Sequence, residues 1–174
     1  MRKKLKLLKD KAGWYTQEPN SDCCTLIAAL NTLKFYEKEI NEKEIIELYK
    51  DMYYNKIGIG DQQLTALFSI LGLYFQFGHF DLEYIKYMLD ANIPLVVDTL
   101  IANHRTLGKF THLVLITDYK IIKRKTYLFC CNGVKSGSGW VPWSKLKKVF
   151  YMYNEKKFCE NICFAMTGII NKEV

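Results

Sequence analysis

The sequence is poor in residues that interrupt a fold. It has three prolines and ten glycines in 174 residues, with no internal repeat or low-complexity stretch. This leaves little room for a linker, and the length suits one domain. No apolar run approaches the roughly 18 residues of a membrane span, and the start MRKKLKLLKDK lacks the apolar core of a signal peptide. We expect a single cytoplasmic domain over 1–174 with a basic N-terminal arm at 1–12.

A disulfide or metal framework is also missing. The six cysteines form two adjacent pairs, Cys23–Cys24 and Cys130–Cys131, followed by Cys159 and Cys163, and no C-x2-C repeat joins them. Adjacent residues on a strand point to opposite faces, so they suit neither a disulfide framework nor a zinc ribbon. We expect reduced thiols, no metal and no cofactor.

The formal charge of +7 comes almost entirely from lysine. Nucleic-acid recognition favours arginine over lysine, because the planar guanidinium forms paired hydrogen bonds with planar acceptor groups. In addition, no lysine-rich run is interleaved with aromatic residues on which bases could stack. We therefore expect a solvated basic surface and no nucleic-acid partner. For the arm at 1–12, contact with a membrane or an acidic partner is the alternative to simple surface.

Helical patterns fill the first half of the chain and strand patterns the second. Helices are expected at Asp22–Tyr36, from Asn41 onward, at Asp61–Leu71 and at Asp81–Leu89. Strands are expected at Leu73–Phe77, Leu95–Leu100, His112–Tyr119, Lys125–Cys131 and Ile162–Ile170, with a short helix after Pro142. This order predicts an α+β fold with N-terminal helices packed on a C-terminal, mostly antiparallel sheet.

Cys23 falls at the first turn of a predicted helix. The partial positive charge of a helix N-terminus favours the thiolate, which is the nucleophilic form of cysteine. Gln17, six residues earlier, has an amide that could donate to a developing oxyanion. The alternative is that Cys23 and Cys24 are ordinary cysteines at the start of a helix.

A base for this nucleophile is best sought at His112, because it opens an apolar strand, whereas His79 and His104 lie in turn-like segments. If the following hairpin is centred near Ile122, position 112 faces position 132, with Cβ atoms about 5 Å apart. Asn132 would then orient the imidazole. A slip of one residue would break this pairing. Asp118 has suitable chemistry but lies too far along the same strand.

Four segments resemble papain-like cysteine peptidases in their order and spacing. The stretch TQEPNSDCCTLIAALNTLKFY is similar to the glutamine-to-cysteine box of that fold, most of all in the double-glycine leader (bacteriocin-processing) peptidases and their stand-alone relatives. DLEYIKYMLDANIPLVVDTL resembles the following helix and strand, and THLVLITDY resembles the histidine strand. LFCCNG stands where the family usually ends a strand in Asp-Pro, and asparagine there resembles papain itself.

The resemblance implies a papain-like fold with a Cys-His-Asn triad. Cys23 would be the nucleophile, His112 the base and Asn132 its orienting residue, while Gln17 and the Cys23 amide would form the oxyanion hole. Cys24 replaces the family's usual glycine and is the rival nucleophile. We expect the substrate to contact Cys24, Gly133 and, in the segment that closes the site, Trp140.

The expected activity is cleavage of a peptide or isopeptide bond in a protein or peptide substrate. The alternatives are another cysteine-dependent acyl transfer or amidase reaction on the same fold, and a catalytically inactive peptide-binding module. Because no transporter domain accompanies this chain, the expected enzyme is a cytosolic processing peptidase or one encoded by a virus or phage. The sequence leaves its oligomeric state open.

Overall fold

The computed structural model describes residues 7–17, 23–54, 61–79, 81–102, 109–134, 137–154 and 162–169. In chain order its elements are β1 (Leu8–Lys9), β2 (Tyr15–Thr16), α1 (Cys24–Phe35), α2 (Glu42–Tyr54), α3 (Asp61–Ile70), β3 (Leu73–His79), α4 (Leu82–Asp90), β4 (Leu95–Ala102), β5 (Lys109–Ile122), β6 (Lys125–Val134), β7 (Gly137–Pro142), α5 (Trp143–Asn154) and β8 (Ile162–Ile169). The helices and strands expected from the sequence are present, with ends shifted by a few residues. The strands β1, β2 and β7 are additional.

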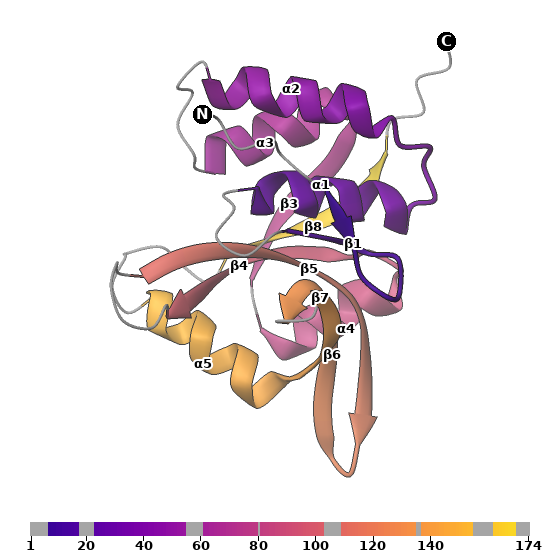
Figure 1. The fold of residues 1–174 in the computed structure, drawn as a ribbon. Helices are drawn as coiled ribbons and strands as arrows, with labels where there is room; N and C mark the ends of the chain where they lie inside the picture. Colours follow the sequence, from indigo (N-terminus) through magenta and orange to yellow (C-terminus); the bar gives the residue numbers. More distant parts are fainter. Residues whose placement is uncertain are drawn as a thin grey trace.

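The main sheet has the strand order β3-β8-β4-β5-β6-β7, and each pair of neighbours runs antiparallel. Strand β8, from the end of the chain, lies between β3 and β4, so distant parts of the sequence form one sheet (Figure 1). The short strands β1 and β2 form a separate antiparallel pair. The expected α+β class with an antiparallel sheet is therefore confirmed.

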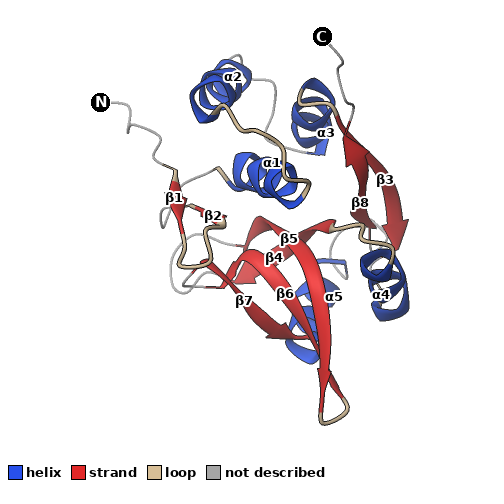
Figure 2. Cartoon of the chain, turned by 90° about the vertical axis from the view of Figure 1, so that its right-hand side faces the viewer, coloured by secondary structure: helices blue, strands red, loops and turns tan. Residues whose placement is uncertain are grey.

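Helices cover both faces of this sheet. Helices α1, α2 and α3 lie over one face and α4 and α5 over the other (Figures 1 and 2). The alternation along β5 explains how one strand serves two cores: Leu113 and Leu115 pack on the α1 side, and Val114 and Ile116 on the α4 side. The expectation of helices from the first half on strands from the second is therefore too simple. Strand β3 comes from the first half, and α5 comes from the second.

The apolar stripe predicted for the first helix is buried against the sheet. Leu26, Ile27, Leu30 and Leu33 of α1 are all 6% exposed or less. Complete burial of a side chain of this size contributes about 1.5–3 kcal/mol. Helix α1 packs against β5 and β6, which lie in the sheet beneath it.

Three local signals read from the sequence form as expected. Asn41 Oδ1 accepts from the Glu44 amide at 3.3 Å, and Asn41 Nδ2 donates to the Glu44 carboxylate at 3.1 Å, just before and within the first turn of α2. Asp81 Oδ1 accepts from the Tyr84 amide at 2.9 Å at the start of α4. Gly72, with φ of 71°, follows α3 in the left-handed conformation that suits glycine.

The β5–β6 hairpin has a different register from the predicted one. Its two-residue turn is Lys123–Arg124, and the pairing runs from Ile122↔Lys125 to Leu115↔Cys131, with a bulge near residue 117. One further step would place position 132 opposite 114. The prediction that 112 faces 132 is therefore wrong, because the turn is centred on Lys123–Arg124, one to two residues later in the sequence than the expected centre at Ile122.

The part of the basic arm that the structure describes, residues 7–12, belongs to the fold. Besides β1, it contains Asp10, whose carboxylate accepts from the Ser138 amide at 2.8 Å and from the Ser138 hydroxyl. These bonds attach the N-terminal segment to β7. In the described part of the chain, no helix has both the length and the apolarity needed to cross a membrane.

Candidate active site

Cys23 lies at the entry to α1. It is the N-cap residue, with φ of −114° and ψ of 21°, and its carbonyl accepts from the Ile27 amide at 3.0 Å. Asp22, the expected cap, lies outside the described residues. Cys23 is 1% exposed and belongs to the same buried cluster as Leu113 and Cys131. Cys23 therefore lies at a helix N-terminus, where partial positive charge favours a thiolate, within the core shared by α1, β5 and β6.

His112 belongs to a buried run of β5, residues 112–116, and is 8% exposed. Its Nε2 lies 2.6 Å from the main-chain oxygen of Asn132. A carbonyl oxygen only accepts hydrogen bonds, so Nε2 carries the proton in this contact. Nδ1 is then the basic nitrogen of the neutral ring. His112 and Asn132 meet, as the sequence predicts, but through the main-chain carbonyl instead of the side-chain amide.

Burial sets the protonation state of this imidazole. Desolvation lowers the pKa of His112 below its ordinary 6.5, and the hydrogen bond to Asn132 opposes this with a smaller effect. The neutral ring is therefore favoured near pH 7. A neutral imidazole with its proton on Nε2 is equipped to accept a proton at Nδ1.

Asn132 has a left-handed backbone, with φ of 60°, inside the irregular stretch of β6–β7 pairing between Cys130 and Val134. Asparagine tolerates this conformation better than most residues. Its Oδ1 accepts from the Thr16 hydroxyl at 3.1 Å and the Gln17 amide at 3.3 Å, and its Nδ2 donates to Gln17 Oε1 at 3.4 Å. Asn132 thus holds the side-chain amide oxygen of Gln17 toward β6.

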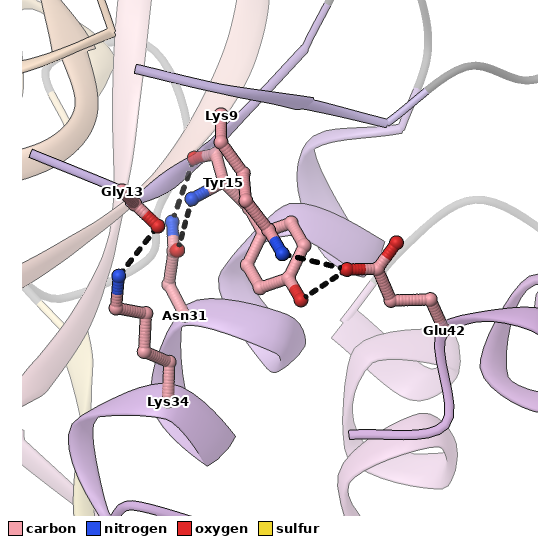
Figure 3. A network of polar contacts seen from close by, with 6 residues as sticks. All are labelled: Lys9, Gly13, Tyr15, Asn31, Lys34 and Glu42. Carbon is pink, nitrogen blue, oxygen red and sulfur yellow. Dashed lines mark hydrogen bonds and ion pairs between the residues drawn. The ribbon is translucent and has the colours of Figure 1, made fainter. Parts of the chain in front are cut away.

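Asn31 holds the segment that leads to Gln17. It is fully buried on α1, where its Oδ1 accepts from the Tyr15 amide at 2.8 Å and its Nδ2 donates to the Tyr15 carbonyl at 3.0 Å (Figure 3). Cys23, Ile27 and Asn31 are spaced four residues apart and share one face of the helix. The helix that begins at the candidate nucleophile therefore also fixes the strand before Gln17.

Further polar contacts attach the β1–β2 segment to α1 and α2. The Tyr15 hydroxyl donates to Glu42 at 2.7 Å, and Lys9 Nζ lies 2.8 Å from the same carboxylate oxygen and 4.6 Å from the Tyr15 ring centroid (Figure 3). The Lys9 bond, followed by the Tyr15 bond, lowers the pKa of Glu42. Lys34 of α1 donates to the Gly13 carbonyl. The loop between β1 and β2 is thus held at both ends.

The residues expected to contact the substrate fall into two groups. Cys24 is the first residue of α1 and is partly exposed, and Gly133 follows Asn132 in β6. Both adjoin a predicted catalytic residue in the chain. Trp140 lies farther along the β6–β7 pairing, opposite Phe129, with 5.2 Å between ring centroids and 36% exposure. Trp140 therefore sits near the hairpin stem instead of beside Asn132.

Two other cysteines are poor nucleophile candidates. Cys130 and Cys131 are thiols within the buried strands. Burial raises the pKa of Cys130 to about 12 and raises that of Cys131 as well. Within the residues that the structure describes, no group of three His, Cys, Asp or Glu side chains is placed to hold a metal ion. Cys159 and His104 lie outside those residues.

The sequence predicted that His112 and Asn132 meet, but it assigned Gln17 to the oxyanion hole with Cys23 and did not predict its bonds to Asn132; it also missed Asn31 and Thr16. Asn31 was detectable as the polar residue within the apolar stripe of α1, a place where an amide needs partners. Thr16 carried no such signal. No family model, curated protein or solved structure matches this chain. The resemblance to papain-like peptidases therefore rests on the residues themselves.

Proposed function

We propose that this chain is a cysteine peptidase with a papain-like fold, which cleaves a peptide or isopeptide bond with Cys23 as nucleophile and His112 as base. The observation that carries the proposal is the 2.6 Å contact between His112 Nε2 and the Asn132 carbonyl. It supports this role for His112, because a proton on Nε2 keeps Nδ1 as the basic nitrogen of the neutral ring. The bond to the carbonyl fixes this tautomer, and it is the one that a general base accepting at Nδ1 requires.

In the proposed reaction, Nδ1 takes the thiol proton as the sulfur bonds to the substrate carbonyl carbon. The resulting oxyanion accepts hydrogen bonds from the NH2 group of Gln17 and from the main-chain amide of Cys23. The C–N bond then breaks and the amine leaves with the proton from Nδ1. Water, deprotonated by His112, hydrolyses the thioester and regenerates the thiol.

The burial of His112 favours proton transfer during attack over a standing ion pair. Its lowered pKa makes the imidazolium costly, so the resting site holds a neutral ring. The proposal also includes a cytoplasmic setting, because the mechanism needs Cys23 reduced.

Alkylation by iodoacetamide, followed by peptide mapping, tests the nucleophile and its base together. We expect Cys23 to be labelled ahead of Cys130 and Cys131, whose raised pKa values keep them as thiols. His112→Ala should slow labelling of Cys23 near pH 7. Because Cys23 is only 1% exposed, the same experiment measures whether a small reagent reaches it. Fragmentation spectra separate it from Cys24 in the shared peptide.

A peptide library read by mass spectrometry then tests hydrolysis. Cys23→Ala should abolish cleavage, His112→Ala should slow it by about 10²–10⁴-fold, and the matched Cys24→Gly should retain it. Labelling of Cys24 instead of Cys23, or labelling of Cys23 that ignores His112, would contradict the assignment. Products joined to an added amine would indicate acyl transfer, and a reactive Cys23 without turnover would indicate a binding module.

A further inference from the structure

The β5–β6 hairpin extends well beyond the body of the fold (Figures 1 and 2). Its end, residues 120–125, reads KIIKRK and is called the hairpin tip below. It contains four cations and two isoleucines. Ile121 is 59% exposed and Ile122 46% exposed, although both are large apolar side chains. An isolated exposed isoleucine is ordinary, but two at the end of a protruding cationic hairpin require an explanation.

The turn of this hairpin is built from residues that do not favour it. Lys123 has φ of 48° and Arg124 φ of 63°, the left-handed pair of a two-residue hairpin turn. Asparagine and glycine adopt these angles most readily, and other residues pay a steric cost. The chain thus keeps two long cationic side chains where Asn-Gly would make a more stable turn. Such a local cost points to a role for the side chains themselves.

Positive charge gathers at the hairpin tip, and the nearest acidic residue in the sequence lies in the stem. No carboxylate lies in the tip, and among the described residues none forms an ion pair with Lys123, Arg124 or Lys125. Lys120 lies 3.9 Å from the ring centroid of Trp140 and covers the stem. The acidic residue Asp118 belongs to the stem as well. The tip therefore presents three cations that have no ion-pair partner in the described part of the chain, next to two exposed aliphatic side chains.

We propose that the hairpin tip binds the surface of an anionic lipid bilayer. Isoleucine side chains enter the boundary between headgroups and acyl chains, and lysine and arginine next to them contact the anionic headgroups. A single-stranded nucleic acid would use the same cations, but it is typically held by aromatic side chains stacked on bases. The exposed apolar residues of the tip are aliphatic, which favours the lipid surface. This binding is independent of the proposed peptidase activity.

The sequence of the tip supplies two sharp variants. Lys123→Asn/Arg124→Gly removes two cations while giving the turn its preferred residues, so the hairpin should remain folded. Ile121→Thr/Ile122→Thr removes the apolar contact but keeps β-branched side chains that suit a strand. The control Lys145→Gln/Lys148→Gln removes two exposed cations from α5 and changes the net charge by the same amount as the first variant.

Co-sedimentation with vesicles of phosphatidylcholine alone, or with phosphatidylserine added, measures binding at physiological salt. We expect binding only to the anionic vesicles. Each tip cation should contribute about fivefold, so the turn variant should bind roughly 30-fold more weakly. The isoleucine variant should bind at least about tenfold more weakly, because both side chains lose contact with the acyl region. The α5 control should bind as the wild type does.

Several results would overturn the proposal. Absence of binding to anionic vesicles would do so directly. An equal loss in the α5 control would mean that net charge, and not the tip, governs binding. Binding to single-stranded RNA that depends on Lys123 and Arg124 but ignores the isoleucine variant would assign the tip to nucleic acid. Circular dichroism and thermal melts of each variant check that the fold is retained.

Discussion

Replacing Asn132 with glycine separates its two kinds of contact with the site. Its main-chain carbonyl accepts from His112, whereas its side chain contacts Thr16 and Gln17. Glycine keeps the carbonyl and adopts the φ of 60° without steric cost. We therefore expect Asn132→Gly to preserve the orientation of His112 and most of the labelling rate of Cys23. Asn132→Ala keeps the carbonyl too, but at a conformational cost.

The stability changes can be estimated from the same contacts. The side-chain hydrogen bonds of Asn132 are 3.1, 3.3 and 3.4 Å long, so their loss should cost about 1–2 kcal/mol in total. Relief of the left-handed backbone offsets roughly 1 kcal/mol of this in the glycine variant. Alanine loses the same bonds without that relief. We expect the alanine variant to be about 1 kcal/mol less stable than the glycine variant.

Urea unfolding measures the two free energies, and the iodoacetamide rate at Cys23 reports the site. If Asn132→Gly slows labelling as far as His112→Ala does, the Asn132 side chain orients the ring and the carbonyl argument fails. If alanine proves as stable as glycine, the left-handed conformation at position 132 carries no cost, and the reason given for asparagine there is refuted. Because unfolding does not depend on catalysis, the stability result stands whatever the protein does.

Two further predictions concern buried polar groups. The pKa of His112 is lower in the folded state, so below pH 6.5 the unfolded state binds a proton more readily than the folded state does. The free energy of unfolding should therefore fall as the pH drops below 6.5, by at most about 1.4 kcal/mol per pH unit. Urea unfolding from pH 5 to 8 measures this slope, and His112→Gln should flatten it. Asn31→Leu leaves the Tyr15 amide and carbonyl without their buried partner, and should cost about 2–4 kcal/mol in the same assay. The control Thr32→Val loses only a bond within α1 and should cost about 1 kcal/mol, and equal losses in both variants would refute the role given to Asn31.

The helices were predictable because their signals are local. Asn41 and Glu44 lie within one turn and define the start of α2 by their own hydrogen bonds, and Asp81 does the same for α4. The apolar stripe of α1 needs only the helical period. None of these depends on how the rest of the chain folds, so sequence and structure agree.

The missed strands depend on their partners. Strand β7 reads GSGWVP, which has little strand propensity, and it forms along the edge that β6 offers. Strands β1 and β2 have two residues each and are held by side chains from other elements, among them Asn31 and Glu42. The prediction of the hairpin register was wrong for a related reason. A two-residue turn of this kind usually has the sequence Asn-Gly, so Lys123–Arg124 gives no signal for it.

The candidate site shows where residue types inform and where they mislead. A cysteine at a helix start and a histidine at the head of a buried strand are side-chain signals, and both were readable. The group that contacts the histidine ring is a main-chain carbonyl, which every residue has. What the sequence can encode is the conformation that aims this carbonyl. Asparagine is among the few residues that accept a left-handed backbone. The sequence analysis chose Asn132 for its side-chain amide, whereas the structure uses its backbone conformation to direct the carbonyl at His112. A glycine should serve there nearly as well, and a β-branched residue should not.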